Sequence, residues 1–166
     1  MRIYILGALL IVLAGWGYMH ARQLSDSAIA DFYVMDSKTT AELDVTASCA
    51  LVADDFHGTS VSQIRGESVR QELDKAKYCD DMQKSIARLR EAAEAAHVQL
   101  NVSYHNQQNS VVYASDHRSA TVDVTYQFDI GRVHISGKRT DQLVKRDGKV
   151  LLVQQDDHNE VSLVMR

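Results

Sequence analysis

Side chains that could perform acid–base chemistry occur at two places in the chain. Asp54 and Asp55 are adjacent and His57 follows closely, so a carboxylate could act as a general base and the imidazole as its acid partner. Tyr126 is a further candidate acid, and Tyr104 and Tyr126 are candidate ligand-binding residues because both fall on the apolar side of predicted strands. These residues form no recognisable constellation. The alternative interpretation is a solvated turn at residues 54–57 and two tyrosines that belong to the core.

Two more polar residues, His134 and Arg139, fall on one predicted strand at opposite parity. Successive side chains of a strand point to opposite faces, so these two residues cannot form one site as strand neighbours. The seven histidines lack the paired spacing of metal ligands, and the sequence predicts no metal site. It contains no phosphate-binding loop, nucleophile elbow or Cys/His catalytic signature, and we expect no cofactor.

Two cysteines, Cys49 and Cys79, each lie on the apolar stripe of a predicted helix. Both stripes face the same core, so a disulfide between residues 30 positions apart is predicted, which fits an oxidising compartment. The alternative is a pair of buried free thiols, because cysteine is often a small core residue.

The charge of the chain argues against nucleic acid as a partner. The 166 residues carry a formal net charge of -4 at pH 7 and no dense cluster of Lys and Arg. Neutralisation of phosphates by such residues supplies most nonspecific affinity for nucleic acid.

The N-terminal residues 1–22 form an apolar leader. An uncharged run over residues 3–19 is at the lower limit for crossing a bilayer and is long for a secretory signal. Trp16 and Tyr18 near its end are typical of residues that anchor a helix at a membrane interface. We therefore predict a membrane anchor, with a domain of residues 23–166 on the extracytoplasmic side. The alternative is a cleaved signal peptide and a secreted or periplasmic domain.

Helical periodicity predicts three helices in the first half of the domain. The first is short and starts at the capping residues 25–27. The second starts at a capping box formed by Thr39 and Glu42 and runs toward Asp54. The third and longest extends over residues 67–96.

The apolar period changes to two after the third helix, which predicts strands. The alternation begins over residues 98–105, is clearest over residues 120–130, and continues in a strand over residues 132–145. Asp147-Gly148 then predicts a two-residue hairpin before a last strand over residues 150–155. Helices followed by a meander of strands indicate an α+β fold, with the helices on one face of an antiparallel sheet. A parallel architecture is not expected.

Two stretches resemble the nuclear-transport-factor-2-like superfamily, in particular its SnoaL-like branches. The first is ALVADDFHGTSVSQIRGESVRQEL, which is similar to a second helix ending in an Asp-Asp-aromatic turn, a short hairpin and an Arg-Gly lead into a third helix. The second is SATVDVTYQFDIGRVHISGKRTDQLVKRDGKVLLVQQD, which is similar to the last long strands of that family. Together they cover 62 of the 144 residues of the predicted domain.

The resemblance implies a curved sheet that wraps the helices into a cone-shaped α+β barrel. Such a cone can hold a small molecule or be blocked by side chains or a partner. The resemblance also implies a homodimer formed through the outer face of the sheet. The alternative is an exposed polar face on a tethered monomer, because polar residues alternate without interruption over residues 121–129.

Two functional hypotheses follow. The first is an exported or membrane-tethered, noncatalytic domain that acts by binding or assembly, with an envelope protein as a possible partner. The second is a SnoaL-like lyase or isomerase that transfers a proton on a small apolar ligand held in the cone, with Asp54 or Asp55 as base and Tyr126 or His57 as acid.

Overall fold

The computed structural model describes residues 23–64, 66–97 and 99–163 of the chain. The predicted leader, residues 1–22, lies outside these ranges, and its role as anchor or signal stays a prediction. Within the described ranges, no helix combines the length and the apolar character that a membrane crossing requires.

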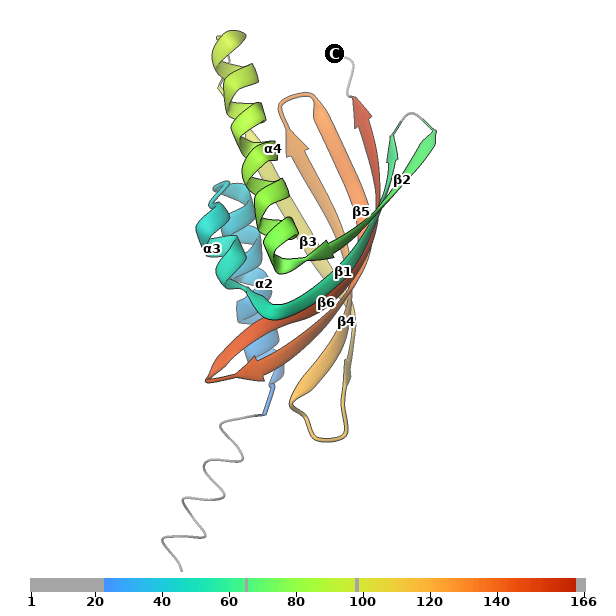
Figure 1. The fold of residues 1–166 in the computed structure, drawn as a ribbon. Helices are drawn as coiled ribbons and strands as arrows, with labels where there is room; N and C mark the ends of the chain where they lie inside the picture. Colours follow the sequence, from blue (N-terminus) through green and yellow to red (C-terminus); the bar gives the residue numbers. More distant parts are fainter. Residues whose placement is uncertain (1–22, 65, 98, 164–166) are drawn as a thin grey trace, which may run out of the picture.

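The described residues form a curved, six-stranded sheet with helices on one side (Figure 1). The strands follow the order β2-β1-β6-β5-β4-β3 across the sheet. Neighbouring strands are antiparallel, except that β1 and β6 are parallel. The strands are β1 (Val52–Ile64), β2 (Glu67–Asp74), β3 (Val102–Tyr113), β4 (Ser119–Ile130), β5 (Val133–Arg146) and β6 (Lys149–Leu163).

Three described helices cover this side of the sheet (Figure 1). Each begins after a capping residue, Ser25, Asp44 or Asp74, whose side-chain oxygen accepts a hydrogen bond from the backbone N–H three residues later. The helices are α2 (Asp26–Ala41), α3 (Val45–Ala50) and α4 (Lys75–Ala95).

The main core lies between α2 and the middle of the sheet. Ile29 and Tyr33 of α2 are both 1% exposed and belong to one cluster with Val122, Val124 and Leu143 of the sheet. The alternation predicted for residues 120–130 matches the inward and outward positions of β4. The α+β class and a long-stranded sheet are thereby confirmed.

The predicted limits of the helices are wrong in three places. The first helix is not short but spans 16 residues and includes Thr39, which the sequence suggested as a cap of the second. The second helix ends at Ala50, and residues 52–64 form β1 instead. Residues 67–74, expected to start the third helix, form β2.

The physical reasons lie in two local features. Pairing of β1 with β6 shifts register between Val52 and His57, and this irregularity interrupts the alternation by which a strand is recognised. Gly66 has a positive φ of 85° and turns β1 into β2, so it closes a hairpin rather than leading into a helix. Helix α4 instead begins after Asp74, whose side chain caps its first turn.

The predicted antiparallel sheet is confirmed except at one pair, because β1 lies parallel to β6. The predicted hairpin at Asp147-Gly148 is confirmed. Both residues have positive φ, 50° and 78°, as the type I′ turn of a two-residue hairpin requires. β6 then continues to Leu163, beyond the predicted end at residue 155.

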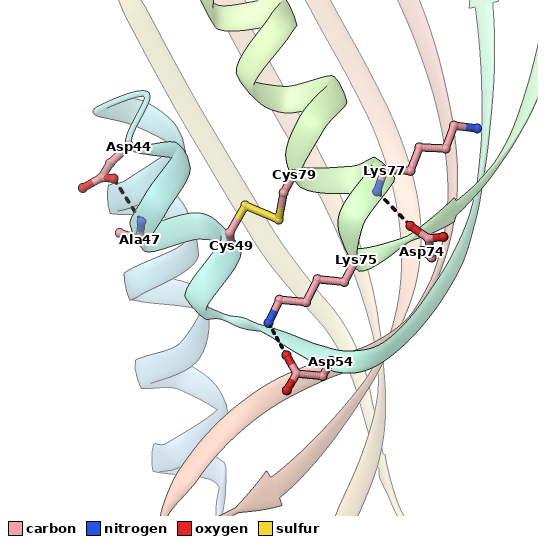
Figure 2. Close-up of a disulfide and its surroundings, with 8 residues drawn as sticks. All are labelled: Asp44, Ala47, Cys49, Asp54, Asp74, Lys75, Lys77 and Cys79. Carbon is pink, nitrogen blue, oxygen red and sulfur yellow. Dashed lines mark hydrogen bonds and ion pairs between the residues drawn. A yellow bond between two sulfur atoms is a disulfide. The ribbon is translucent and has the colours of Figure 1, made fainter.

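The two cysteines are joined in a disulfide that links α3 to α4 (Figure 2). Their Cα atoms are 5.8 Å apart, within the usual range for a disulfide. Close to it, Lys75 at the start of α4 forms an ion pair with Asp54 of β1 (Figure 2). The bridge and the ion pair therefore fix the beginning of α4 against the preceding elements.

Candidate functional site

A cavity of about 320 Å³ lies between the helices and the inward face of the sheet. Asp36 and Thr40 of α2 and Tyr78 and Met82 of α4 line it from the helix side. The sheet supplies the rest of the lining: Ser62 of β1, Tyr104 of β3, Tyr126 and Phe128 of β4, Ile135 and Arg139 of β5, and Gln155, Asp157, Asn159 and Val161 of β6.

The lining changes from polar to apolar along the strands. The inward-facing residues of β5 run from Asp141, which is fully buried, through Arg139 to Ile135. Ile135 lies opposite Phe128 of β4 and Val161 of β6, so the cavity is apolar at that end. We call the Arg139 end the polar end and the Ile135 end the apolar end.

Arg139 is the only cation among the described residues that line this cavity. Its Nη2 lies 2.6 Å from Asp36 Oδ2 and its Nε lies 2.9 Å from Asp141 Oδ2. The guanidinium also lies over the rings of Tyr33 and Tyr126, at 5.8 and 5.7 Å from their centroids. The Nε–H is not aligned with Asp141 and has no hydrogen-bond acceptor among the described residues. The contact with Asp141 is thus an ion pair without a hydrogen bond.

Asp141 is held by neutral donors as well. The hydroxyl of Tyr33 donates to Oδ2 at 2.9 Å, and Gln155 Nε2 donates to Oδ1 at 3.1 Å. Burial raises the pKa of Asp141, and the Arg139 cation and these two hydrogen bonds oppose that rise. The nearby carboxylates in turn raise the pKa of Arg139 despite its burial, so Arg139 remains a cation.

A second polar group surrounds Asp157. Tyr126 Oη donates to Asp157 Oδ1 at 2.8 Å, while Asn159 Nδ2 and Ser60 Oγ donate to Oδ2 at 2.6 and 3.2 Å. The ring of Tyr126 lies against Gly137, because a Cβ added there would meet its Cζ and Oη at 2.8 Å. The missing side chain at residue 137 therefore makes the room in which Tyr126 reaches Asp157.

The tyrosines of the cavity are held in the protonated form. Burial, as the largest cause, raises the pKa of Tyr78, Tyr104 and Tyr126 above the ordinary value. The Asp157 carboxylate raises the pKa of Tyr126 further. At neutral pH these hydroxyls act as hydrogen-bond donors.

The structure puts the predicted acid–base residues of the first half outside this cavity. Asp54 is 98% exposed and pairs with Lys75 at 2.7 Å. Asp55 accepts two hydrogen bonds from Arg146, at 2.6 and 2.9 Å, and these lower its pKa, whereas a general base at neutral pH needs a raised one. His57 is exposed on β1 and does not line the cavity either.

The predicted ligand-binding residues, by contrast, both line the cavity. The rings of Tyr104 and Tyr126 lie 6.1 Å apart, and the Tyr104 hydroxyl donates to Asp36 Oδ2 at 3.4 Å. The opposite orientation of His134 and Arg139 also holds, because His134 pairs with Asp129 at 2.6 Å while Arg139 points inward.

The sequence interpretation singled out Arg139 without placing it in a site, and it did not name Asp36, Asp141 or Asp157. Arg139 and Asp141 share the parity of Ile135 and Leu143, so two charges on the inward side of a strand were the available signal. Asp36 and Asp157 gave no comparable signal. Among the described residues, no group of three metal-ligating side chains comes together.

Comparison with known proteins identifies the fold of the chain but not its function. No protein-family model matches the sequence, and no curated protein matches it. Solved structures do match. A conserved protein from Planctomyces limnophilus DSM 3776 has a TM-score of 0.57 at 13% identity, covering 84% of this chain and 97% of that one. An NTF2-like protein of unknown function from Pseudomonas putida KT2440 has a TM-score of 0.56 at 12% identity, covering 80% and 84%.

A ketosteroid isomerase-like protein from Erwinia carotovora atroseptica SCRI1043 has a TM-score of 0.54 at 10% identity, covering 80% of this chain and 94% of that one. The chain has the nuclear-transport-factor-2-like (NTF2-like) fold. The fold that the resemblance implied is thereby confirmed, although residues 54–56 and 67–74 lie in strands rather than at a helix end and a helix start. In this NTF2-like cone, the cavity beside Arg139 is the interior of the cone. Identities this low concern the fold, and the chemistry must be argued from the cavity itself.

Proposed function

We propose that this NTF2-like domain is a noncatalytic binding domain that holds a small, largely apolar molecule in its cone. The observation that carries the proposal is the cavity of about 320 Å³, which has an apolar end at Ile135, Phe128 and Val161 and hydrogen-bonding groups at the other. Ligand sites usually combine an apolar wall with a few polar groups that fix orientation.

The carboxylates at the polar end favour binding over catalysis. Asp36 and Asp141 are paired with Arg139, and Asp157 accepts three hydrogen bonds. A general base needs a carboxylate that can reach a substrate proton, and each of these carboxylates already has a partner within the domain. The three carboxylates therefore serve to build the cavity.

Thermal-shift measurements on the full chain with a panel of small amphipathic molecules test this proposal. At least one compound is expected to raise the Tm. Val161→Trp, which fills the apolar end, is expected to abolish the shift. The matched control is Ser162→Trp, the next residue on β6, which is exposed and does not line the cavity. A panel without any shift, or equal shifts in both variants, would refute the proposal.

We further propose that the domain works outside the cytoplasm, tethered through residues 3–19. The apolar run supports the tether, and the Cys49–Cys79 disulfide supports an oxidising compartment. A homodimer formed through the outer face of the sheet, or an envelope protein as partner, stays a prediction.

A second candidate function, a lyase or isomerase acting by proton transfer, is favoured by one contact. Tyr126 and Asp157 form a hydroxyl–carboxylate pair at 2.8 Å that faces the cavity, so Asp157 would be the base rather than Asp54 or Asp55. Incubation of a bound compound in D₂O distinguishes the two functions. An enzyme exchanges a C–H of the ligand for deuterium and loses this exchange in Asp157→Asn, whereas the binding domain shows none.

A further inference from the structure

A second, apolar chamber of about 210 Å³ lies between the end of α2, α3 and α4. Leu43 and Ser48 line it on one side and Ile86 and Leu89 of α4 on the other. Its wall is formed almost wholly by carbon atoms. An apolar cavity of roughly 150 Å³ can hold a benzene ring, so this chamber is large enough for a short hydrocarbon group.

Three residues, Thr40, Met82 and Phe128, line both this chamber and the cone cavity. The two spaces are therefore neighbours, separated by these side chains. Phe128 belongs to the apolar end of the cone cavity, opposite Ile135. Methionine is unbranched and adapts its shape at low cost, so Met82 can give way to a chain that passes from one space to the other.

The charges of the polar end indicate which head group a ligand with such a hydrocarbon chain would carry. Three carboxylates, Asp36, Asp141 and Asp157, surround one cation, Arg139. Asp36 and Asp141 share that cation, whereas Asp157 has only neutral hydrogen-bond donors and no ion-pair partner among the described residues. Asp157 is half-buried, and three carboxylates face a single cation, so the polar end carries an excess of negative charge that a cationic ligand would offset.

We propose that the ligand is a cationic amphiphile, with an amine beside Asp157 and Tyr126 and a hydrocarbon tail that passes Met82 and Phe128 into the apolar chamber. The faces of Tyr104 and Tyr126 add a favourable environment for a cation. This inference rests on the proposed function, because it names the class of molecule that the cone binds.

Isothermal titration calorimetry of the full chain at pH 7 with octylamine, octanol, octanoate and butylamine tests both halves of the inference. Octylamine is expected to bind at least about tenfold more tightly than octanol, and octanoate more weakly still, because a carboxylate would face Asp36 and Asp157. Butylamine is expected to bind about 100-fold more weakly than octylamine, because four fewer CH₂ groups are buried.

Two pairs of variants locate the site. Asp157→Asn is expected to remove the preference for octylamine over octanol, whereas Asp123→Asn, an equal change of net charge on an exposed position, is expected to keep it. Leu89→Trp, which fills the apolar chamber, is expected to weaken octylamine and to leave butylamine unchanged.

The outcomes separate this inference from the proposed function. If octanol binds as tightly as octylamine and Asp157→Asn has no effect, the inference that the ligand carries an amine is refuted, while the proposed binding function stands. If octylamine and butylamine bind with equal affinity to the wild-type chain, the inference that a hydrocarbon tail occupies the apolar chamber is refuted. This outcome does not depend on whether Leu89→Trp folds. If no octyl compound binds, and the thermal-shift panel is also silent, the binding function itself falls.

Discussion

The guanidinium of Arg139 lies 2.9 Å from the carboxylate of Asp141, which is 0% exposed. A pair of this kind contributes little net stability when both partners are present, since each ion loses its hydration on burial. Removal of one partner is far more costly, because the other charge is then buried alone.

Arg139→Met is therefore expected to lower the free energy of unfolding by about 3 to 5 kcal/mol, measured by urea denaturation. The double variant Arg139→Met/Asp141→Leu is expected to recover a large part of that loss, because it also removes the fully buried one of the two carboxylates that lose their cation. A loss below about 1 kcal/mol in the single variant would contradict the ion-pair description of the polar end.

Loss of the disulfide is expected to destabilise the domain in a redox-dependent way. Cys49 and Cys79 close a loop of 30 positions, and removal of such a bridge by Cys49→Ser/Cys79→Ser is expected to cost about 3 to 4 kcal/mol in urea denaturation. The wild-type chain with reductant should fall to the same stability, while the double variant should not respond to reductant. Two free thiols in denatured, unreduced wild-type chain would refute the bridge.

Gly137→Ala is expected to disturb the polar end through Tyr126. The new Cβ would meet the Tyr126 ring at 2.8 Å and the backbone oxygen of His158 at 2.8 Å, and the backbone has little room to retreat. We expect a loss of about 1 to 3 kcal/mol in urea denaturation, typical of overpacking. Lys138→Ala, on the adjacent exposed position, is the control and should change stability by less than about 0.5 kcal/mol. Equal stability of the two variants would show that Tyr126 does not lie against Gly137.

Alkaline pH is expected to destabilise the domain through its tyrosines. Burial raises the pKa of Tyr33, Tyr78, Tyr104 and Tyr126, so each stays protonated in the folded chain and ionises in the unfolded chain above its ordinary pKa of about 10. The unfolded state then binds fewer protons, and the stability present below pH 10 is lost as pH rises.

The loss between pH 9 and pH 11 is expected to reach about 1 kcal/mol for each of these tyrosines, measured by urea denaturation at both pH values. Tyr33→Phe should reduce the dependence on pH by one such step. Tyr113, which is partly buried, gives a second readout: burial and Asp26 raise its pKa to about 12, so this side chain should contribute little phenolate absorbance at pH 11 in the folded chain. Full ionisation of the folded chain at pH 11 would contradict the buried positions.

The C-terminal half of the fold could be predicted from the sequence because its signals are local. Apolar and polar residues alternate strictly over residues 120–130. Asp147 and Gly148 form a turn that requires positive φ at both positions, and these two residue types adopt it readily. The hairpin of β1 and β2 could not be predicted in this way. Its apolar residues, such as Val69 and Leu73, also fit a helical stripe, and Val69 is 53% exposed, so tertiary pairing decides its conformation.

The sequence analysis predicted only the aromatic part of the candidate site, although the parity of Arg139 and Asp141 also carried a signal. Tyr104 and Tyr126 share the apolar parity of their strands, which places them inside. Asp36 comes from α2 and Asp157 from the last strand, and the two meet Arg139 and Tyr126 only when the sheet has closed around the helix. Local sequence carries no record of such long-range contacts.

The parallel pairing of β1 with β6 has a consequence for biosynthesis. It joins Val52 to Leu152 and Thr59 to Asp156, residues that are separated by most of the domain. Because contacts of large sequence separation slow folding, this domain is expected to fold slowly for its size. A ribosome must release nearly the whole chain before β6 can reach β1. Until β6 arrives, the newly made polypeptide leaves one edge of β1 without a partner strand.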